Sequence, residues 1–211
     1  MTPDRPPCSM NPSMTMNDAA FPILPFGLRL GTRSEGEGAR AELLAALLAI
    51  SEPGRLTVDL SGVDVLSGSF ADEAVAIPCS RLVAGECGDR YLLVRAPHAD
   101  LVDDLAHKLE RRRLAMLCRI DDGWTVLGAL PPPMHETLRL VAERRETTAK
   151  ELADALDIRH NACLHRVGRL ADLRLLRREV VGVIGPHPTY RLSSILPTDL
   201  RPLLDVRFGR G

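Results

Sequence analysis

The sequence predicts an α/β domain followed by a smaller α+β domain. Up to about residue 130, apolar strand-like runs alternate with helical patterns, which is typical of a sheet covered by helices. Three prolines at 131–133 then interrupt the chain, and proline runs act as stiff spacers. After them the order is helix, turn, helix and hairpin. We therefore expect a disordered N-terminus over 1–20, the α/β domain over 21–130, a proline linker over 131–134, the α+β domain over 135–195 and a C-terminal segment with a helical pattern over 196–211.

The elements of the first domain follow from apolar spacing and from turn residues. In chain order we expect an apolar strand region at Phe21–Leu30, a polar loop at Gly31–Gly38, a helix at Ala39–Ile50, a turn at 51–54, a strand at Leu56–Leu60, a helix at Phe70–Ala84 that Pro78 kinks or shifts, a buried strand at Tyr91–Arg95, a helix from Pro97 to about Arg113, and a hairpin that joins Leu114–Ile120 to Trp124–Leu127 through Asp121-Asp-Gly123.

Charge is distributed unevenly along the chain. Residues 1–131 hold 13 Lys and Arg against 18 Asp and Glu, a net charge of −5, whereas residues 132–211 hold 14 against 10, a net charge of +4. Within 159–191, seven arginines stand against Asp172 and Glu179, which gives +5. This concentration favours an anionic partner for the second domain. Aromatic residues make up only 3% of the chain, which argues against single-strand binding by base stacking.

The composition also indicates a compartment. The five cysteines are scattered, form no CxxC pair and have no histidine placed to complete a zinc set, so we interpret them as reduced thiols. No stretch is long enough to span a bilayer, and the N-terminus lacks the pattern of a signal peptide. We expect a bacterial, cytoplasmic protein that has no membrane contact.

The most informative part of the second domain begins at Thr148-Ala-Lys-Glu151. These residues have the spacing of a capping box, which predicts the start of a helix. A second helix follows the break at Asp157–His160, and an apolar run, a Gly-Pro tip and Tyr190-Arg-Leu192 then predict a β-hairpin. This order resembles the winged helix-turn-helix of MarR- and ArsR-like bacterial regulators over roughly residues 134–192. Arg174 departs from the pattern, because such regulators often have Gly before the wing.

The resemblance implies that one helix enters the major groove and that the hairpin lies beside it. We expect base contacts from the start and the outer face of the second helix, and phosphate contacts from the residues around it. The residues expected to reach base edges are His160, Asn161, Ala162, His165, Arg166 and Arg169. The residues expected to hold phosphates, with His187 as a further contact of the hairpin, are Lys150, Arg177, Arg178 and Arg191.

The first domain carries a second resemblance in residues 56–75, LTVDLSGVDVLSGSFADEAV. This segment resembles the bacterial STAS-like domains related to anti-sigma-factor antagonists, over about residues 22–120, and the match is most specific at Ser69–Glu73. The resemblance implies that Ser69 stands where the antagonists are phosphorylated by a partner kinase. Two alternatives remain: Ser69 caps its helix, or it is phosphorylated. Asp72 and Glu73 either serve acid/base chemistry or complement the helix dipole.

Enzymatic function is the class that the sequence supports least. No phosphate loop follows Gly36-Glu-Gly38, and no serine lies in a nucleophile-elbow context. We expect no cofactor, no metal and no catalytic residue.

Two functional hypotheses remain, with a third beside them. The first is a transcriptional regulator that binds duplex DNA, with a regulatory STAS-like domain. The second is a protein-interaction switch that answers to a kinase-like or sensor partner at the Ser67–Glu73 loop. A nucleic-acid accessory protein without sequence preference is the third. Homodimerisation is also expected, through the leucines of Ile195–Val206 or the helix at 135–146, although these leucines equally suit a core.

Overall fold

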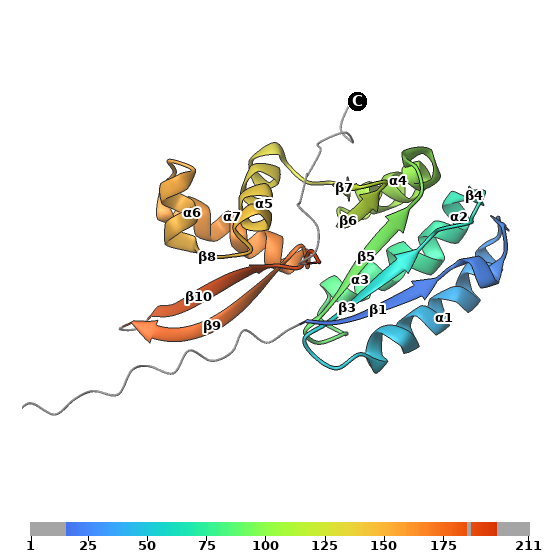
Figure 1. The fold of residues 1–211 in the computed structure, drawn as a ribbon, viewed down its shortest axis with the longest axis horizontal. Helices are drawn as coiled ribbons and strands as arrows, with labels where there is room; N and C mark the ends of the chain where they lie inside the picture. The colour runs from blue at the N-terminus through green and yellow to red at the C-terminus, as the bar shows by residue number, and fades with distance from the viewer. Residues whose placement is uncertain (1–15, 185–186, 198–211) are drawn as a thin grey trace, which may run out of the picture.

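The computed structural model describes residues 16–184 and 187–197, and its centre is a five-stranded sheet (Figure 1). The strand order is β1-β3-β5-β6-β7, in which the first four strands run parallel and β7 is antiparallel to β6. A short parallel pair, β2 (Arg29–Leu30) with β4 (Val65–Leu66), lies apart from it. The strands of the main sheet are β1 (Asn17–Pro22), β3 (Gly54–Asp59), β5 (Arg90–Ala96), β6 (Ala115–Ile120) and β7 (Gly123–Gly128).

Four helices pack on one face of this sheet. They are α1 (Arg33–Ala49), α2 (Gly68–Ala71), α3 (Ile77–Val83) and α4 (Asp103–Arg111). A 3-10 turn at Ala99–Val102 leads into α4, and another lies at Leu24–Phe26. Alternate strand residues face the helices because side chains alternate across a strand. This first core includes Leu43, Leu47, Leu56, Val58, Leu92, Val94, Leu105, Leu109, Met116 and Cys118.

The mixed α/β class is as expected for this part of the chain, and several element bounds differ. β1 begins at Asn17, so the prediction of disorder is wrong for residues 17–20. The expected loop at Gly31–Gly38 is wrong from Arg33 onward, because Thr32 and Glu35 form a capping box that starts α1 there.

The helical run continues from Gly68 to Val83, and the regular helix that contains Pro78 begins only at Ile77. A π-helical turn at Asp72–Ala76 joins α2 to α3, and Pro78 occupies the first turn of α3. Proline has no N–H to donate to the preceding turn, so a wider turn before it accommodates the missing bond.

The C-terminal part, residues 131–197, combines three helices with a three-stranded antiparallel sheet of order β8-β10-β9. Pro132 and Pro133 lie in the first turn of α5, where a proline loses no hydrogen bond, so the expected linker at 131–134 is wrong. The short strand β8 was not anticipated. The elements are α5 (Pro132–Arg144), β8 (Glu146–Thr148), α6 (Ala149–Ala155), α7 (His160–Asp172), β9 (Leu176–Ile184) and β10 (His187–Ser194).

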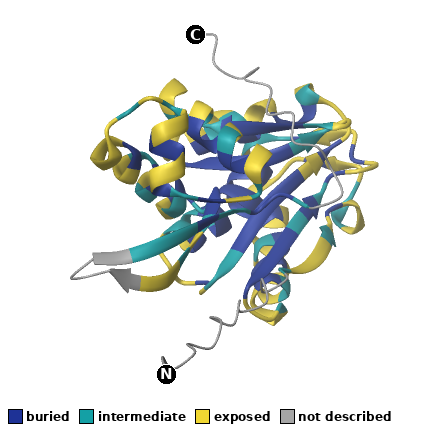
Figure 2. Ribbon diagram, turned by 60° about the vertical axis from the view of Figure 1, so that its left-hand side comes forward, coloured by how far each residue is buried: buried dark blue, intermediate teal, exposed yellow. Residues whose placement is uncertain are grey.

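The face of the main sheet that the four helices leave uncovered packs against the C-terminal part. Figure 1 shows α5, α6, α7 and the β9–β10 hairpin grouped beside the main sheet. Figure 2 shows the strands of the main sheet largely buried at the centre of the molecule. Both parts contribute to one apolar cluster, which we call the shared core; it includes Tyr91, Leu93, Leu117, Trp124, Val126, Leu138, Val141, Leu152, Val167, Leu170, Leu192, Ile195 and Leu196.

Polar contacts also join the two parts. The Arg55 guanidinium donates to the carbonyl of Ile195, and Arg177 Nε donates to Asp89 Oδ2 at 2.9 Å. Arg174 Nε donates to the carbonyl of Leu82 at 3.3 Å. The two parts are therefore connected by buried apolar surface and by directed hydrogen bonds.

Candidate nucleic-acid interface

The pair α6 and α7 is built from local signals that the sequence carries. Thr148 and Glu151 form the expected capping box at the start of α6, and the tight turn after α6 places Asp157 at a φ of 50°. Three residues of α7, Cys163, Val167 and Leu170, are buried in the shared core. Their spacing leaves the opposite side of α7 free to face solvent.

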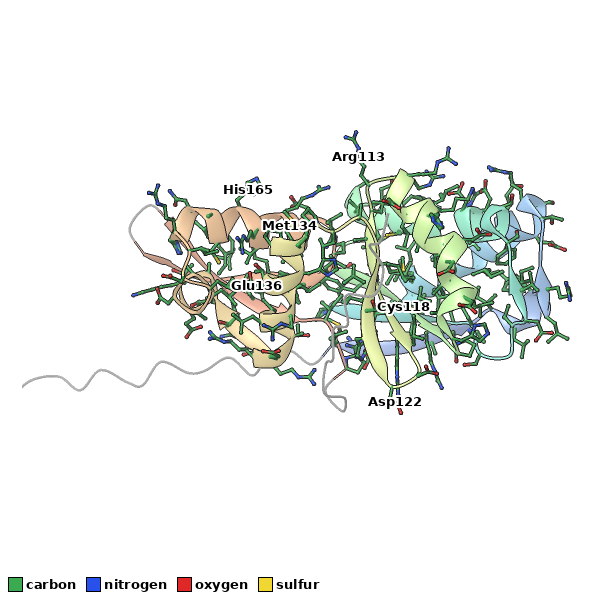
Figure 3. All side chains as sticks on the ribbon, turned by 90° about the horizontal axis from the view of Figure 1, so that it is seen from above. Arg113, Cys118, Asp122, Met134, Glu136 and His165 are labelled. Atoms are coloured by element: carbon green, nitrogen blue, oxygen red, sulfur yellow. The ribbon has the colours of Figure 1, made fainter. Side chains whose placement is uncertain are left out.

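The exposed side of α7 presents most of the residues expected to reach base edges. Figure 3 shows His165 pointing away from α7 into solvent. The expected base-reading residues that are exposed are His160, Asn161, Ala162, His165 and Arg169, and Lys150 is exposed on α6. Asp172 is exposed at the end of the same helix and contributes one negative charge.

Arg166 differs from the other predicted base-reading residues. Its guanidinium donates to the Pro133 carbonyl at 3.3 Å and to Thr137 Oγ1 at 3.5 Å, and it lies 3.8 Å from a Glu136 carboxylate oxygen. Residue 166 lies three positions after the buried Cys163 and directly before the buried Val167. It therefore lies at the edge of the buried side of α7, where α5 packs, and not at the centre of the exposed side. In this conformation Arg166 joins α7 to α5, and a base contact from it stays a prediction.

Arg178, on β9, is the hairpin residue best placed to extend the surface of α7. Its side chain is exposed, and its guanidinium lies 4.7 Å from the centre of the Tyr190 ring, within the range of a cation–π contact. The same guanidinium lies 3.8 Å from the position that a Cβ on Gly168 would occupy. Tyr190 thus holds Arg178 between the hairpin and α7, a role that the sequence analysis did not assign to this tyrosine.

Arg177 is turned to the other face of β9, because neighbouring residues of a strand alternate. Only 11% of its side chain is exposed, and it is paired with Asp89 at 2.9 Å and with both carboxylate oxygens of Glu179 at 3.1 Å. The structure thus engages Arg177 within the protein, and a phosphate contact from it stays a prediction.

The remaining predicted contacts divide into two groups. Arg191 is half-buried on β10, opposite Glu179. The side chain of His187 and the tip at 185–186 lie outside the described residues. Arg174 adopts a φ of 59°, the left-handed conformation that glycine accommodates most easily, and its side chain bonds to Leu82 rather than lying near the outer surface.

The Ser67–Glu73 loop contains a structural cap and two buried carboxylates. Ser67 is the N-cap of α2: its hydroxyl oxygen accepts from the Phe70 amide and donates to the Gly31 carbonyl. Ser69 is the second residue of α2 and is exposed, so the alternative that Ser69 caps the helix is wrong. The cap is two residues earlier because Ser67, not Ser69, has extended backbone geometry.

Asp72 and Glu73 are both occupied by arginines. Arg112 donates to both oxygens of Asp72, at 2.8 and 3.0 Å, and this hydrogen bonding lowers the pKa of that carboxyl below its ordinary value. Glu73 is almost fully buried between Arg33, at 2.5 Å, and Arg40. Both carboxyl groups are thus held by arginine side chains, an arrangement typical of a structural role.

The described residues contain no group of acidic, cysteine or histidine side chains that could hold a metal ion. The described cysteines, Cys79, Cys87, Cys118 and Cys163, are buried and unpaired, and burial raises the pKa of the Cys79 thiol to about 12. A thiol of high pKa is a poor nucleophile at neutral pH.

The surfaces expected to form a dimer have mixed outcomes. Ile195 and Leu196 are buried in the shared core, as the core alternative requires, and Leu200, Leu203 and Leu204 lie outside the described residues. On α5, Leu138 and Val141 also face the shared core, whereas Arg139 and Glu143 pair on the outer side.

Comparison with known proteins gave no match among protein-family models or among curated sequences. Across residues 16–184 and 187–197, no helix is long and apolar enough to cross a membrane. The geometry of the site is therefore the basis for any functional proposal.

Proposed function

We propose that the protein is a DNA-binding transcriptional regulator whose C-terminal part acts as a winged helix and whose N-terminal part acts as a STAS-like regulatory module. The observation that carries the proposal is the solvent-facing side of α7, where Asn161, His165 and Arg169 are exposed together. Asparagine and arginine are the side chains that make bidentate contacts with adenine and guanine. The helix is anchored from behind by the shared core, so these side chains project from a rigid support.

Arg178 supports the same proposal from the hairpin. The Arg178 guanidinium lies beside α7. Within the described part of the chain it forms no ion pair with a carboxylate, whereas the guanidinium of its neighbour Arg177 does. Lys150 adds a second exposed cation on α6. A base-reading helix flanked by phosphate-binding cations matches the way in which such proteins divide specificity from positioning.

The test uses the full chain with a library of random duplexes, from which bound sequences are selected, followed by affinity measurements over a salt series. Removing Arg169 (R169A) is expected to relax the selected sequence preference and to cost about 1–3 kcal/mol of binding free energy. Removing Arg178 (R178A) is expected to weaken binding to every sequence alike. It should also reduce the slope of log affinity against log salt by about 1.

Two matched controls make the experiment specific. R177A removes the adjacent arginine, which is already paired inside the protein, and should leave the salt slope unchanged. R139A removes an exposed arginine on the outer side of α5 and should also have no effect on the slope. Absence of salt-dependent affinity for any duplex would contradict the proposal.

A protein-interaction switch is the second candidate, and one observation favours it. Leu164 on α7 and Val180 and Val181 on β9 are large apolar side chains with 37%, 61% and 46% of their surface exposed. Exposed large apolar residues are more typical of protein docking than of phosphate binding. If V180S and V181S abolish capture of a protein partner while duplex binding is absent, this candidate replaces the first.

A further inference from the structure

A cavity of about 350 Å³ lies on the face of the main sheet that the helices leave uncovered, and it extends along β3 from Arg55 to Asp59. A row of cross-strand neighbours crosses its floor: Asp59 on β3 opposes Arg95 on β5, Arg95 opposes Arg119 on β6, and Arg119 opposes Trp124 on β7. Pro197 lines the cavity from the C-terminal part. Cavities of this size, at junctions between parts of a chain, are common sites for small molecules.

Two of the three arginines that line the cavity have only weak partners. Arg55 is buried and engaged by Asp18 and by the Ile195 carbonyl. Arg95 lies 3.7 Å from the Asp59 carboxylate, which is too long for a hydrogen bond. Arg119 donates from Nε to the Asp121 carbonyl at 3.2 Å and from its Nη2 to an Asp122 carboxylate oxygen at 3.4 Å. Asp122 projects from the tip of the β6–β7 hairpin into solvent, where a charge pair is strongly screened (Figure 3).

Trp124 adds an independent observation. This residue, the one tryptophan of the sequence, lines the cavity and is only 2% exposed, and its Nε1–H has no hydrogen-bond partner among the described residues. A buried donor without an acceptor is costly, and native structures usually supply one. The lining of the cavity therefore includes the guanidinium groups of Arg95 and Arg119 and the indole of Trp124, whose N–H is itself buried.

We propose that this cavity binds a small organic molecule through a carboxylate group, with Arg95 and Arg119 as the cations. A guanidinium pairs with a carboxylate through charge-assisted hydrogen bonds, and Arg95 and Arg119 are cross-strand neighbours on β5 and β6. The two acidic residues of the cavity, Asp18 and Asp59, repel a doubly charged phosphate more strongly than a singly charged carboxylate. The site is independent of DNA binding and is tested without DNA.

The experiment titrates the full chain with lactate, glutamate and succinate, and with inorganic phosphate and acetamide as comparison probes. Binding is measured by the emission of Trp124, by calorimetry and by the melting temperature. At least one carboxylate is expected to shift the Trp124 emission and to raise the melting temperature, because a ligand that binds only the folded state stabilises it. Phosphate is expected to bind more weakly, and acetamide is expected not to bind.

Substitutions then locate the site. R95M and R119M are each expected to weaken carboxylate binding at least about tenfold, because each removes one charge-assisted hydrogen-bond donor. R95K should retain part of the affinity, since it keeps the charge and loses the two-pronged geometry. R111M, at an exposed arginine on α4 outside the cavity, is the matched control and should bind as the unsubstituted chain does.

Two outcomes would overturn the proposal. The first is that no carboxylate changes emission, heat or melting temperature, or that R95M and R119M bind as tightly as the control. The second concerns the chain itself, because the sequence continues from Pro197 with Asp199 and Asp205. If free carboxylates bind only after D199N and D205N are introduced together, the natural occupant is this C-terminal segment and not a small molecule.

Discussion

At the scale of single residues, arginine serves two opposite purposes in this protein. Arg33 and Arg40 form ion pairs with the buried side chain of Glu73, and Arg177 forms ion pairs with Asp89 and Glu179. By contrast, Arg169 and Arg178 remain exposed. The density of arginine along the sequence does not distinguish the two purposes, because pairing depends on which acids the fold brings near.

Glu73 is the residue at which burial has the clearest energetic consequence. We expect E73Q to lower the free energy of unfolding by about 1–3 kcal/mol, because it removes one of the two buried carboxyl oxygens to which the exposed Arg33 and the half-buried Arg40 donate. Denaturant unfolding of the full chain measures this loss.

The matched control is E37Q on the exposed side of α1, which should change stability by less than about 0.5 kcal/mol. Equal stability of E73Q and E37Q would show that the Glu73 cluster is not a structural pair and would return Glu73 to the set of functional candidates.

At the scale of elements, apolar spacing and turn residues predicted the helices, strands and turns that depend on neighbouring residues of the chain. The helix ending near Ile50, the strand around Leu92 and the hairpin at Asp121–Gly123 were predicted from spacing and turn residues, and the structure contains all three. The start of α1 was not predicted, because three glycines near it suggested a loop. The capping-box spacing of Thr32 and Glu35 was present in the sequence and indicates the correct start. β8 could not be predicted, since a strand of three residues is specified by its partner β10 and not by its own sequence.

The exposed side of α7 was likewise predictable from helical spacing, whereas the fate of Arg166 and Arg177 was not. Each of these two arginines pairs with residues distant along the chain, Pro133 and Thr137 in one case and Asp89 in the other. Such pairing depends on tertiary packing, about which the periodicity of a single element carries no information.

Two glycines of α1 provide a matched test of packing within one helix. A Cβ on Gly36 would lie 2.8 Å from Glu73 Cβ and 3.1 Å from the Phe70 carbonyl oxygen, whereas a Cβ on Gly38 would meet nothing within 4 Å. G36A is therefore expected to destabilise the protein by about 1–3 kcal/mol through overpacking. G38A is expected to stabilise it by about 0.4–1 kcal/mol, because alanine restricts the unfolded chain and favours helix.

Thermal or denaturant unfolding of the two variants measures both effects in the same helix. Opposite signs are the expected result. Stabilisation by both substitutions would mean that α1 does not approach α2 as closely as the Gly36 contacts require.

At the scale of the whole molecule, the shared core is what the sequence analysis did not anticipate. The proline run was interpreted as a spacer, and a spacer predicts two independent domains. In the structure the prolines begin α5, and residues from Tyr91 to Leu196 pack into one apolar cluster. Sequence pattern shows which residues are apolar, but it does not show that two sets of apolar residues cover each other.

We expect the chain to unfold in a single cooperative transition because of this core. The emission of Trp124, which reports on the shared core, should change together with far-ultraviolet circular dichroism across a denaturant series. L138A, a truncation on α5, should lower the midpoint of both signals equally, by an amount that corresponds to about 2–5 kcal/mol.

The control for this experiment is L24A, at a leucine that is 41% exposed and lies outside the shared core. Its effect on the midpoint should be much smaller. Separate transitions for the two signals in L138A would mean that the N-terminal and C-terminal parts are stable independently of each other.

The same core gives the order of synthesis a physical meaning. A ribosome completes β7 before it makes any of α5, α6, α7 or the hairpin, because these elements follow it along the chain. During that interval Tyr91, Leu93, Leu117, Trp124 and Val126 form an apolar sheet face whose cover has not yet been made. Nascent chains with such a face are prone to aggregate or to bind chaperones. Each newly made copy of this protein therefore depends on its last third to hide what its first two thirds expose.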